Sequence, residues 1–197
     1  MQTFKHALAS SLRVAAATLL ICVGGYTSLV LGVAQGLAAP TASGSLIRRD
    51  GAVVGSRLIA QGFTRPEYVW PRPSAADYDG QGAGGSNASP AGPELRARGV
   101  EQVARYGATE ARPLPPELAA ASGGGLDPHI TVRAARYQAA RVSVARGVEE
   151  ADVVATIDAL AFAPGGPLTE DRLVNVLELN LALDERFGSR GGEVSDE

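Results

Sequence analysis

VAAATLLICVGGYTSLVLGVAQGLAA, residues Val14 to Ala39, is the stretch of sequence that decides how this chain is organised. Its 26 residues include no Asp, Glu, Lys, Arg or His. As a helix it would be roughly 39 Å long, at about 1.5 Å of rise per residue. The hydrocarbon core of a bilayer is about 30 Å thick. The stretch is therefore predicted to cross a membrane as one somewhat tilted helix.

A cleaved signal peptide is the alternative interpretation of this stretch, because Ala38 and Ala39 are small residues of the kind found at cleavage sites. The apolar region of a signal peptide is usually about 7–15 residues long. The uncharged run here has 26 residues, which favours a retained membrane anchor.

The charges that flank the apolar stretch predict its orientation. Lys5 and Arg13 precede it without any acidic residue, and the next basic residues are Arg48 and Arg49. Because cytoplasmic flanks carry an excess of Lys and Arg, the N-terminus is predicted to be cytoplasmic and the rest exported. We therefore expect a single-pass protein of the cell inner (plasma) membrane with a cytoplasmic tail (1–13), a transmembrane helix (14–39), a soluble periplasmic domain (40–188) and a frayed tail (189–197).

Small residues recur every four positions within the apolar stretch, at Gly24, Ser28, Gly32 and Gly36. In a helix this spacing places them on one slowly drifting stripe. Membrane helices associate largely by close packing at small residues, so the stripe is a predicted docking face for a partner's helix. The simpler interpretation is that glycine is common in membrane helices and in this chain.

The fold class expected for the rest of the chain is α+β, with a small β-sheet and three to four helices. Asp50-Gly51 between two apolar runs predicts a hairpin with strands at 45–49 and 52–59. Pro40 to Gly44 before it is predicted to be a short linker. The remaining elements expected are helices at 94–107, 131–146 and from 149 to about 161, and a strand at 173 that turns into a helix near Asn180.

Residues 61–93 carry many Pro and Gly residues, a composition typical of a loop. Tyr68, Trp70 and Tyr78 nevertheless lie within it. Three of the few aromatic residues of the chain in one segment predict a loop that packs on a surface.

Charge and composition exclude several function classes. After Lys5 and Arg13 are set aside, the remainder holds 16 basic and 21 acidic residues, a net charge of −5. Nucleic acid is therefore not an expected partner, because phosphate binding needs a basic face. Cys22 is the single cysteine, and His6 and His129 are the two histidines, so neither a disulfide nor a zinc site is expected.

Ser122, Asp127 and His129 are residue types found in hydrolytic triads. They lie within eight residues of one another, whereas triads gather side chains from distant segments. A P-loop needs a lysine after its glycines, and the chain has no lysine beyond Lys5. The prediction from these residues is a tight turn in which Asp127 and His129 hydrogen-bond to the local backbone, in a non-catalytic domain.

At SGGGLDPHIT (122–131), the chain resembles the C subunit of the Kdp high-affinity potassium-transporting P-type ATPase. Gly124 and Thr131 stand where serine is usual in that family. The other segments that resemble it occur in the family's order: GSLI (44–47), VGSRLIAQ (54–61), RPSA (72–75), GGSN (84–87), Gln138, Arg141-Val142, Ala145-Arg146-Gly147 and VNVLELNLALD (174–184).

This resemblance implies an accessory, non-catalytic subunit of an ATP-driven potassium uptake complex. Its implied partners are a channel-like potassium-binding subunit, an ATP-hydrolysing P-type subunit, a small single-span subunit and the lipid bilayer. It also implies a role in assembly and as a catalytic chaperone that supports ATP binding by the pump subunit. No cofactor is expected to be tightly bound, and ATP enters only at the level of the complex. The residues that the resemblance implies for nucleotide or subunit contact are Ser122, Gly123, Gly125, Asp127, Pro128, His129, Gln138 and Arg141.

A nucleotide contact disagrees with the predicted topology, because ATP is cytoplasmic and the flanking charges export the domain. An exported domain is expected to act instead by capping the potassium entrance, and its negative net charge does not repel potassium. Two alternatives stay open at this point. One is a membrane-tethered periplasmic enzyme that uses Asp127 and His129, and the other is a tethered binding domain unrelated to transport.

Overall fold

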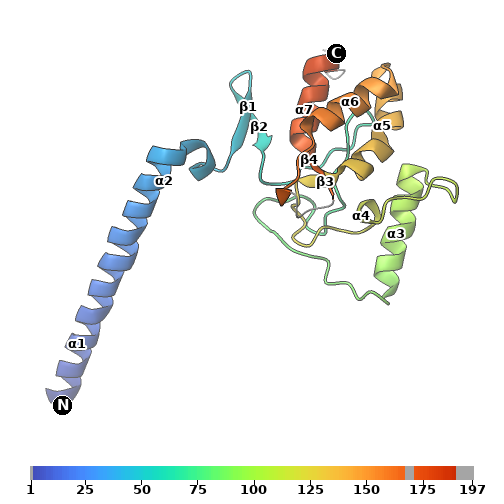
Figure 1. Ribbon diagram of the computed structural model, residues 1–197. Coiled ribbons are helices and arrows are strands. Elements are labelled where there is room, and N and C mark those ends of the chain that lie inside the picture. The colour runs from blue at the N-terminus through green and yellow to red at the C-terminus, as the bar shows by residue number, and fades with distance from the viewer. Residues whose placement is uncertain (1, 167–170, 190–197) are drawn as a thin grey trace, which may run out of the picture. The chain divides into compact units, whose positions relative to one another are not determined.

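The computed structural model describes residues 2–166 and 171–189 (Figure 1). It divides between Leu46 and Ile47 into two compact units, and each is described by itself. The predicted tail at 189–197 lies, apart from Ser189, outside the described residues.

The N-terminal unit is a long helical rod. It consists of α1 (Gln2–Leu19), a π-helical segment η1 (Leu20–Tyr26) and α2 (Thr27–Ala42). Residues Phe4–Ala42 are long and apolar enough to cross a membrane. This finding agrees with the predicted span.

The end of α2 differs from the prediction of a linker beginning at Pro40. The helix continues to Ala42, with Pro40 inside it and a non-helical backbone at Ala38 (φ −147°, ψ 47°). Proline removes one backbone donor and crowds the preceding turn, so it bends this helix rather than ending it. Figure 1 shows the bend near the end of α2.

The predicted hairpin is confirmed by strands β1 (Leu46–Arg49) and β2 (Ala52–Ser56), which pair as a two-stranded sheet. Asp50 and Gly51 both have positive φ (51° and 80°), as a two-residue hairpin turn of type I′ requires. The second strand ends at Ser56 rather than at residue 59. The Ser56 hydroxyl accepts a hydrogen bond from the amide of Leu58 (3.1 Å), which starts a turn in place of the ladder.

Helices α3 (Pro93–Tyr106), α5 (Val132–Arg146) and α6 (Glu150–Leu160) confirm the three helices that the sequence predicted there. Thr131 caps α5 by accepting a hydrogen bond from the amide of Ala134 (3.1 Å). Gly107 and Gly147 end α3 and α5 in the left-handed conformation.

Three elements differ from the prediction. A short helix α4 (Pro116–Ala119) and a strand β3 (His129–Thr131) were not expected. Strand β4 (Leu173–Asn175) pairs antiparallel with β3, Ile130 opposite Val174. Helix α7 (Val176–Phe187) then begins at once, not near Asn180, because the Asn175 side chain caps it by accepting a hydrogen bond from the amide of Glu178 (3.1 Å).

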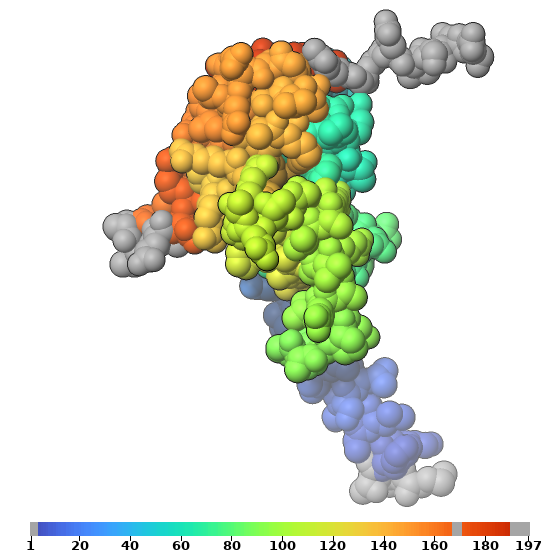
Figure 2. All heavy atoms as spheres, turned by 90° about the vertical axis from the view of Figure 1, so that its right-hand side faces the viewer, coloured from blue at the N-terminus to red at the C-terminus, as the bar shows by residue number. Residues whose placement is uncertain are grey.

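The described fold is therefore α+β, as predicted, but the part after the N-terminal unit has two two-stranded sheets and five helices instead of one small sheet and three to four helices. Its core lies where α5 packs on α6 and α6 on α7 (Figure 1). Figure 2 shows the surface of α3 in yellow-green, below the orange surface of α5 and α6. The buried apolar cluster is Val69, Leu118, Ile130, Ala134, Ala135, Ala139, Val142, Val153, Ile157, Val174, Val176, Leu179 and Leu183.

Candidate functional site

Gln138 and Asn180 hold the backbone of the loop that contains Trp70. The Gln138 side chain accepts a hydrogen bond from the Trp70 amide (2.8 Å) and donates one to the Trp70 carbonyl (3.0 Å). Asn180, on α7, makes the same pair of bonds with Val69 (2.8 and 2.9 Å). Both amide side chains are 1% exposed. An irregular segment is thus buried with its backbone polar groups satisfied by side chains instead of by a sheet.

Two arginines of α5 extend this support along residues 66–70, which we call the held segment. Arg141 donates to the carbonyls of Pro66 and Tyr68 and to the side-chain oxygen of Gln138 (2.7 Å). Arg146, buried at 3% exposure, donates to the carbonyl of Glu67 (2.8 Å). The predicted packing of the aromatic loop is confirmed by these contacts.

Trp70 lies between two guanidinium groups. The guanidinium carbon of Arg141 is 3.6 Å from the centroid of the Trp70 ring, and that of Arg105, on α3, is 4.3 Å away. Tyr106 meets the same ring edge-on at 5.3 Å. Burial lowers the pKa of Arg141 to about 10 and raises that of Tyr106 to about 12. At neutral pH, Arg141 is still charged and Tyr106 still neutral, so the cation–π contacts hold.

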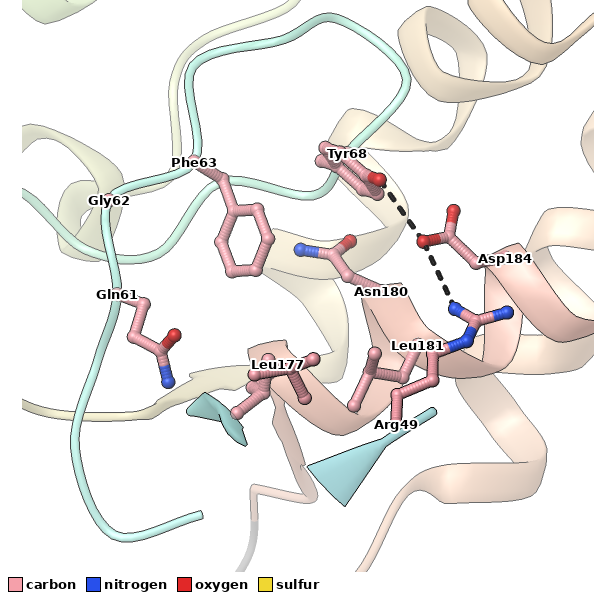
Figure 3. Close-up of a pocket in the computed structure, with 10 residues that line it drawn as sticks. Arg49, Gln61, Gly62, Phe63, Tyr68, Leu177, Asn180, Leu181 and Asp184 are labelled. Carbon is pink, nitrogen blue, oxygen red and sulfur yellow. Dashed lines mark hydrogen bonds and ion pairs between the residues drawn. The ribbon is translucent and has the colours of Figure 1, made fainter. Parts of the chain in front are cut away.

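A cavity of about 270 Å³ opens beside the held segment, between the hairpin and α7 (Figure 3). The Asp184 carboxylate, 8% exposed, lies at its end and accepts a hydrogen bond from the Tyr68 hydroxyl (3.1 Å). Arg146 pairs with the same carboxylate at 2.9 Å, and Arg49 approaches it at 3.7 Å. The charge of the Asp184 carboxylate is therefore compensated within the fold by the buried guanidinium of Arg146 and by the hydroxyl of Tyr68.

The glycine-rich motif joins the long loop to strand β3. The amide of Ser122 donates to the Pro73 carbonyl (3.0 Å), and the amide of Gly84 donates to the Gly124 carbonyl (2.9 Å). Gly125 has a φ of +73° and is buried, whereas Gly123 and Gly124 have open space around them. Ser122 is buried, at 3% exposure, and the turn that it begins holds both ends of residues 73–85 through these two backbone hydrogen bonds.

Asp127 forms the predicted tight turn, whereas the prediction that the His129 side chain also hydrogen-bonds to the local backbone is wrong. The Asp127 carboxylate accepts a hydrogen bond from the amide of His129 (3.0 Å) and an ion-pair contact from Arg72 (3.4 Å). The His129 ring stacks edge-on against Phe162 at 5.4 Å. No hydrogen bond joins the Ser122 hydroxyl to His129 among the described residues, so the geometry does not assemble a triad. The carbonyl of Pro128 accepts a hydrogen bond from the amide of Val176 (2.9 Å).

The predicted site residues fall into two separate groups. Gln138 and Arg141 meet at the held segment, and residues 122–129 meet the loop at 73–85. A contact of either group with a nucleotide or a subunit stays a prediction. Sequence reasoning missed Asn180, Arg146 and Asp184, although each is a polar residue on the apolar side of its helix, a pattern that signals a buried polar contact.

The predicted docking stripe lies on η1 and α2. A Cβ atom added at Gly24, Gly32 or Gly36 would meet nothing within 4 Å, so the chain itself leaves these positions open. Gly24 belongs to η1 and the other three to α2. The wider π-helical turn shifts the phase of Gly24 relative to Ser28. Within residues 2–166 and 171–189, no three His, Cys, Asp or Glu side chains gather as a metal site would require.

Known proteins resemble this chain over most of its length. The family model KdpC, described as "K+-transporting ATPase, c chain", matches residues 8–185. A relative from Parvibaculum lavamentivorans, named a potassium-transporting ATPase KdpC subunit, is 61% identical over 89% of this chain and 94% of the relative. Relatives of the same name from Cereibacter sphaeroides and Myxococcus xanthus are 46% and 45% identical, over 81% and 91% of this chain and 86% and 88% of those proteins.

Proposed function

Because the chain belongs to the KdpC family, the c chains of K+-transporting ATPases, we propose that it is an accessory, non-catalytic subunit needed to assemble an ATP-driven potassium uptake complex. The observation that carries the proposal is the extent of the similarity, which includes both the apolar helix and the soluble domain. Its partners are a channel-like potassium-binding subunit, an ATP-hydrolysing subunit and a small single-span subunit. Family membership argues against a tethered domain unrelated to transport.

The contacts of Gln138 favour an indirect effect on ATP affinity. Both polar groups of its amide bond to the backbone of Trp70, and the side chain is 1% exposed. A direct nucleotide contact would have to break these buried bonds, each of which is costly to leave unmade. The soluble domain therefore acts as a rigid body that favours one state of its partners, for example by capping the potassium entrance from the periplasm.

Cysteine labelling tests the exported orientation. Cys22 is the only cysteine, so a Cys22→Ser background leaves no thiol. Val144 on α5 is 83% exposed, and a Val144→Cys variant is expected to react with a membrane-impermeant maleimide in intact cells with a permeabilised outer membrane. Ser11→Cys, in the predicted cytoplasmic tail, is the matched control and should react only after the inner membrane is opened. Protection of position 144 in intact cells would mean that the orientation is wrong.

Gly32→Leu is expected to release the subunit from its complex while leaving it in the membrane. A leucine would fill the open space at this position and keep a partner helix from close approach. We expect about tenfold less partner protein to co-purify, equivalent to roughly 1.4 kcal/mol. Gly25→Leu is the matched control because Gly25 lies beside the stripe, one residue from Gly24. If Gly32→Leu and Gly25→Leu both recovered the complex as well as the unaltered chain, the spacing of the small residues would reflect the amino-acid composition of the helix and not a docking face.

A further inference from the structure

A second polar cavity, of about 300 Å³, lies between α3 and the loop at residues 73–78. Arg98, Gln102 and Arg105 line it from α3. Their spacing of four and three residues places them on one face of that helix. Ser74 and Tyr78 line it from the loop. The cavity adjoins the held segment through Arg105, which contacts Trp70, and the glycine-rich motif through Pro73, which bonds to Ser122.

Two polar groups in this cavity have no partner in the chain. Gln102 is the one buried residue of α3, at 6% exposure. No hydrogen bond joins its amide to any residue that the structure describes, and the amide atoms keep some accessible surface where the residue lines the cavity. One terminal nitrogen of Arg98, Nη1, is also buried without an acceptor. Buried polar groups are almost always hydrogen-bonded, so the unpaired Arg98 nitrogen, beside an unpaired amide that lines the same cavity, indicates a ligand that supplies their partners.

The other groups that line the cavity are rich in hydrogen-bond donors. The Ser74 hydroxyl oxygen accepts hydrogen bonds from the amides of Ala76 (3.0 Å) and Tyr78 (3.1 Å), which leaves its own hydrogen free to donate. Within the described residues Arg105 forms no ion pair. One of its terminal nitrogens donates to the carbonyl of Phe63 (3.4 Å), and its guanidinium lies over Trp70. The hydroxyl of Tyr78 is not available, because it donates to the carbonyl of Arg72 (3.0 Å).

Two acidic residues also line the cavity but leave its arginines unpaired. Asp77 and Glu101 are exposed to solvent, and neither forms an ion pair with Arg98 or Arg105. No carboxylate among the described residues is paired with either guanidinium, so their positive charge is available to an anion from outside the chain. Guanidinium, amide and hydroxyl donors together match the oxygen atoms of a carboxylate or a phosphate.

We propose that the cavity between α3 and residues 73–78 binds an oxyanion through Arg98, Gln102, Ser74 and Arg105. The same chemistry is offered by an acidic side chain of a partner protein and by inorganic phosphate. This inference is independent of the proposed transport function, since it uses only groups of this chain.

Trp70 provides the readout for the test. It is the only tryptophan of the chain, and Arg105 contacts both its ring and the cavity. The full chain in detergent micelles is titrated with sodium phosphate and, separately, with sodium acetate, with chloride keeping the ionic strength constant. The expected result is a saturable change in Trp70 fluorescence. A response to phosphate alone assigns the cavity to the free anion, and a response to acetate assigns it to a carboxylate. The absence of a saturable change with either anion would overturn the proposal.

Substitutions on α3 distinguish anion binding in the cavity from a general effect of the charge of the helix. Arg98→Gln and Gln102→Leu are each expected to weaken the apparent affinity at least about tenfold. Arg96→Gln is the matched control, because Arg96 lies on the same helix but does not line this cavity. Gln102→Leu removes an amide that has no hydrogen-bond partner among the described residues, so the melting temperature of this variant without anion should not fall, which guards against misfolding as an explanation. Equal anion responses of Arg98→Gln, Arg96→Gln and the unaltered chain would overturn the proposal.

Discussion

Gly125→Ala is expected to destabilise the soluble domain by about 3 kcal/mol or more. Gly125 has a φ of +73°, a conformation that residues with a Cβ atom rarely adopt. Its added Cβ would lie 2.8 Å from the carbonyl oxygen of Gly84 and 2.9 Å from the Cβ of Ala76. Because one of these neighbours is backbone, the loop must move away from the motif. Urea unfolding of the full chain in micelles, followed by Trp70 fluorescence, measures the loss.

Gly124→Ala is the matched control for this prediction. Gly124 has no atom within 4 Å of an added Cβ and no positive φ. Its free energy of unfolding should change by no more than about 0.5 kcal/mol. Both variants replace a glycine by alanine at neighbouring positions, so a difference in their stability reports the backbone conformation and the space at Gly125 and not the substitution itself. Similar losses for both variants would mean that the motif does not clamp the loop as the structure describes.

Gln138→Ala is expected to cost about 4 kcal/mol of unfolding free energy, through two orphaned backbone groups and a small cavity. The amide and carbonyl of Trp70 would both lose their partner, as would the Arg141 guanidinium. Gln138→Glu keeps an acceptor for the Trp70 amide but loses the donor to its carbonyl, so its effect should be smaller. Denaturant unfolding of both variants checks the order.

Arg133→Ala is the control for the Gln138 variants, because Arg133 is an exposed residue of α5 with no hydrogen bond or ion pair among the described residues. Its stability should stay within about 0.5 kcal/mol of the unaltered chain. The ATP affinity of the assembled complex is the second readout. Unchanged stability of Gln138→Ala together with a lost ATP affinity would contradict a positioning role and support a direct nucleotide contact.

Short sequence patterns were sufficient to predict the elements whose conformation depends on neighbouring residues. The apolar run Val14–Ala39, the turn at Asp50-Gly51 and the cap at Thr131 each appear in the structure as expected. In each case, the residues that determine the conformation lie within a few positions of one another. The predicted start of α7 was wrong. The period-two pattern around Val174 and Val176 indicated a longer strand, so the capping role of Asn175 was not recognised.

By itself the sequence determined the long apolar helix, the α+β class, the hairpin turn, the cap of α5 and the family, since hydrophobic periodicity, turn and capping residues are local patterns and the family motifs are read directly from the sequence. Only the tertiary structure decided how residues 66–70 are held, that Gln102 is buried without a partner, and that three-residue strands pair at Ile130 and Val174. The physical reason is that these contacts join segments from about 45 to more than 110 residues apart along the chain, where the burial of one residue depends on side chains that no local window contains.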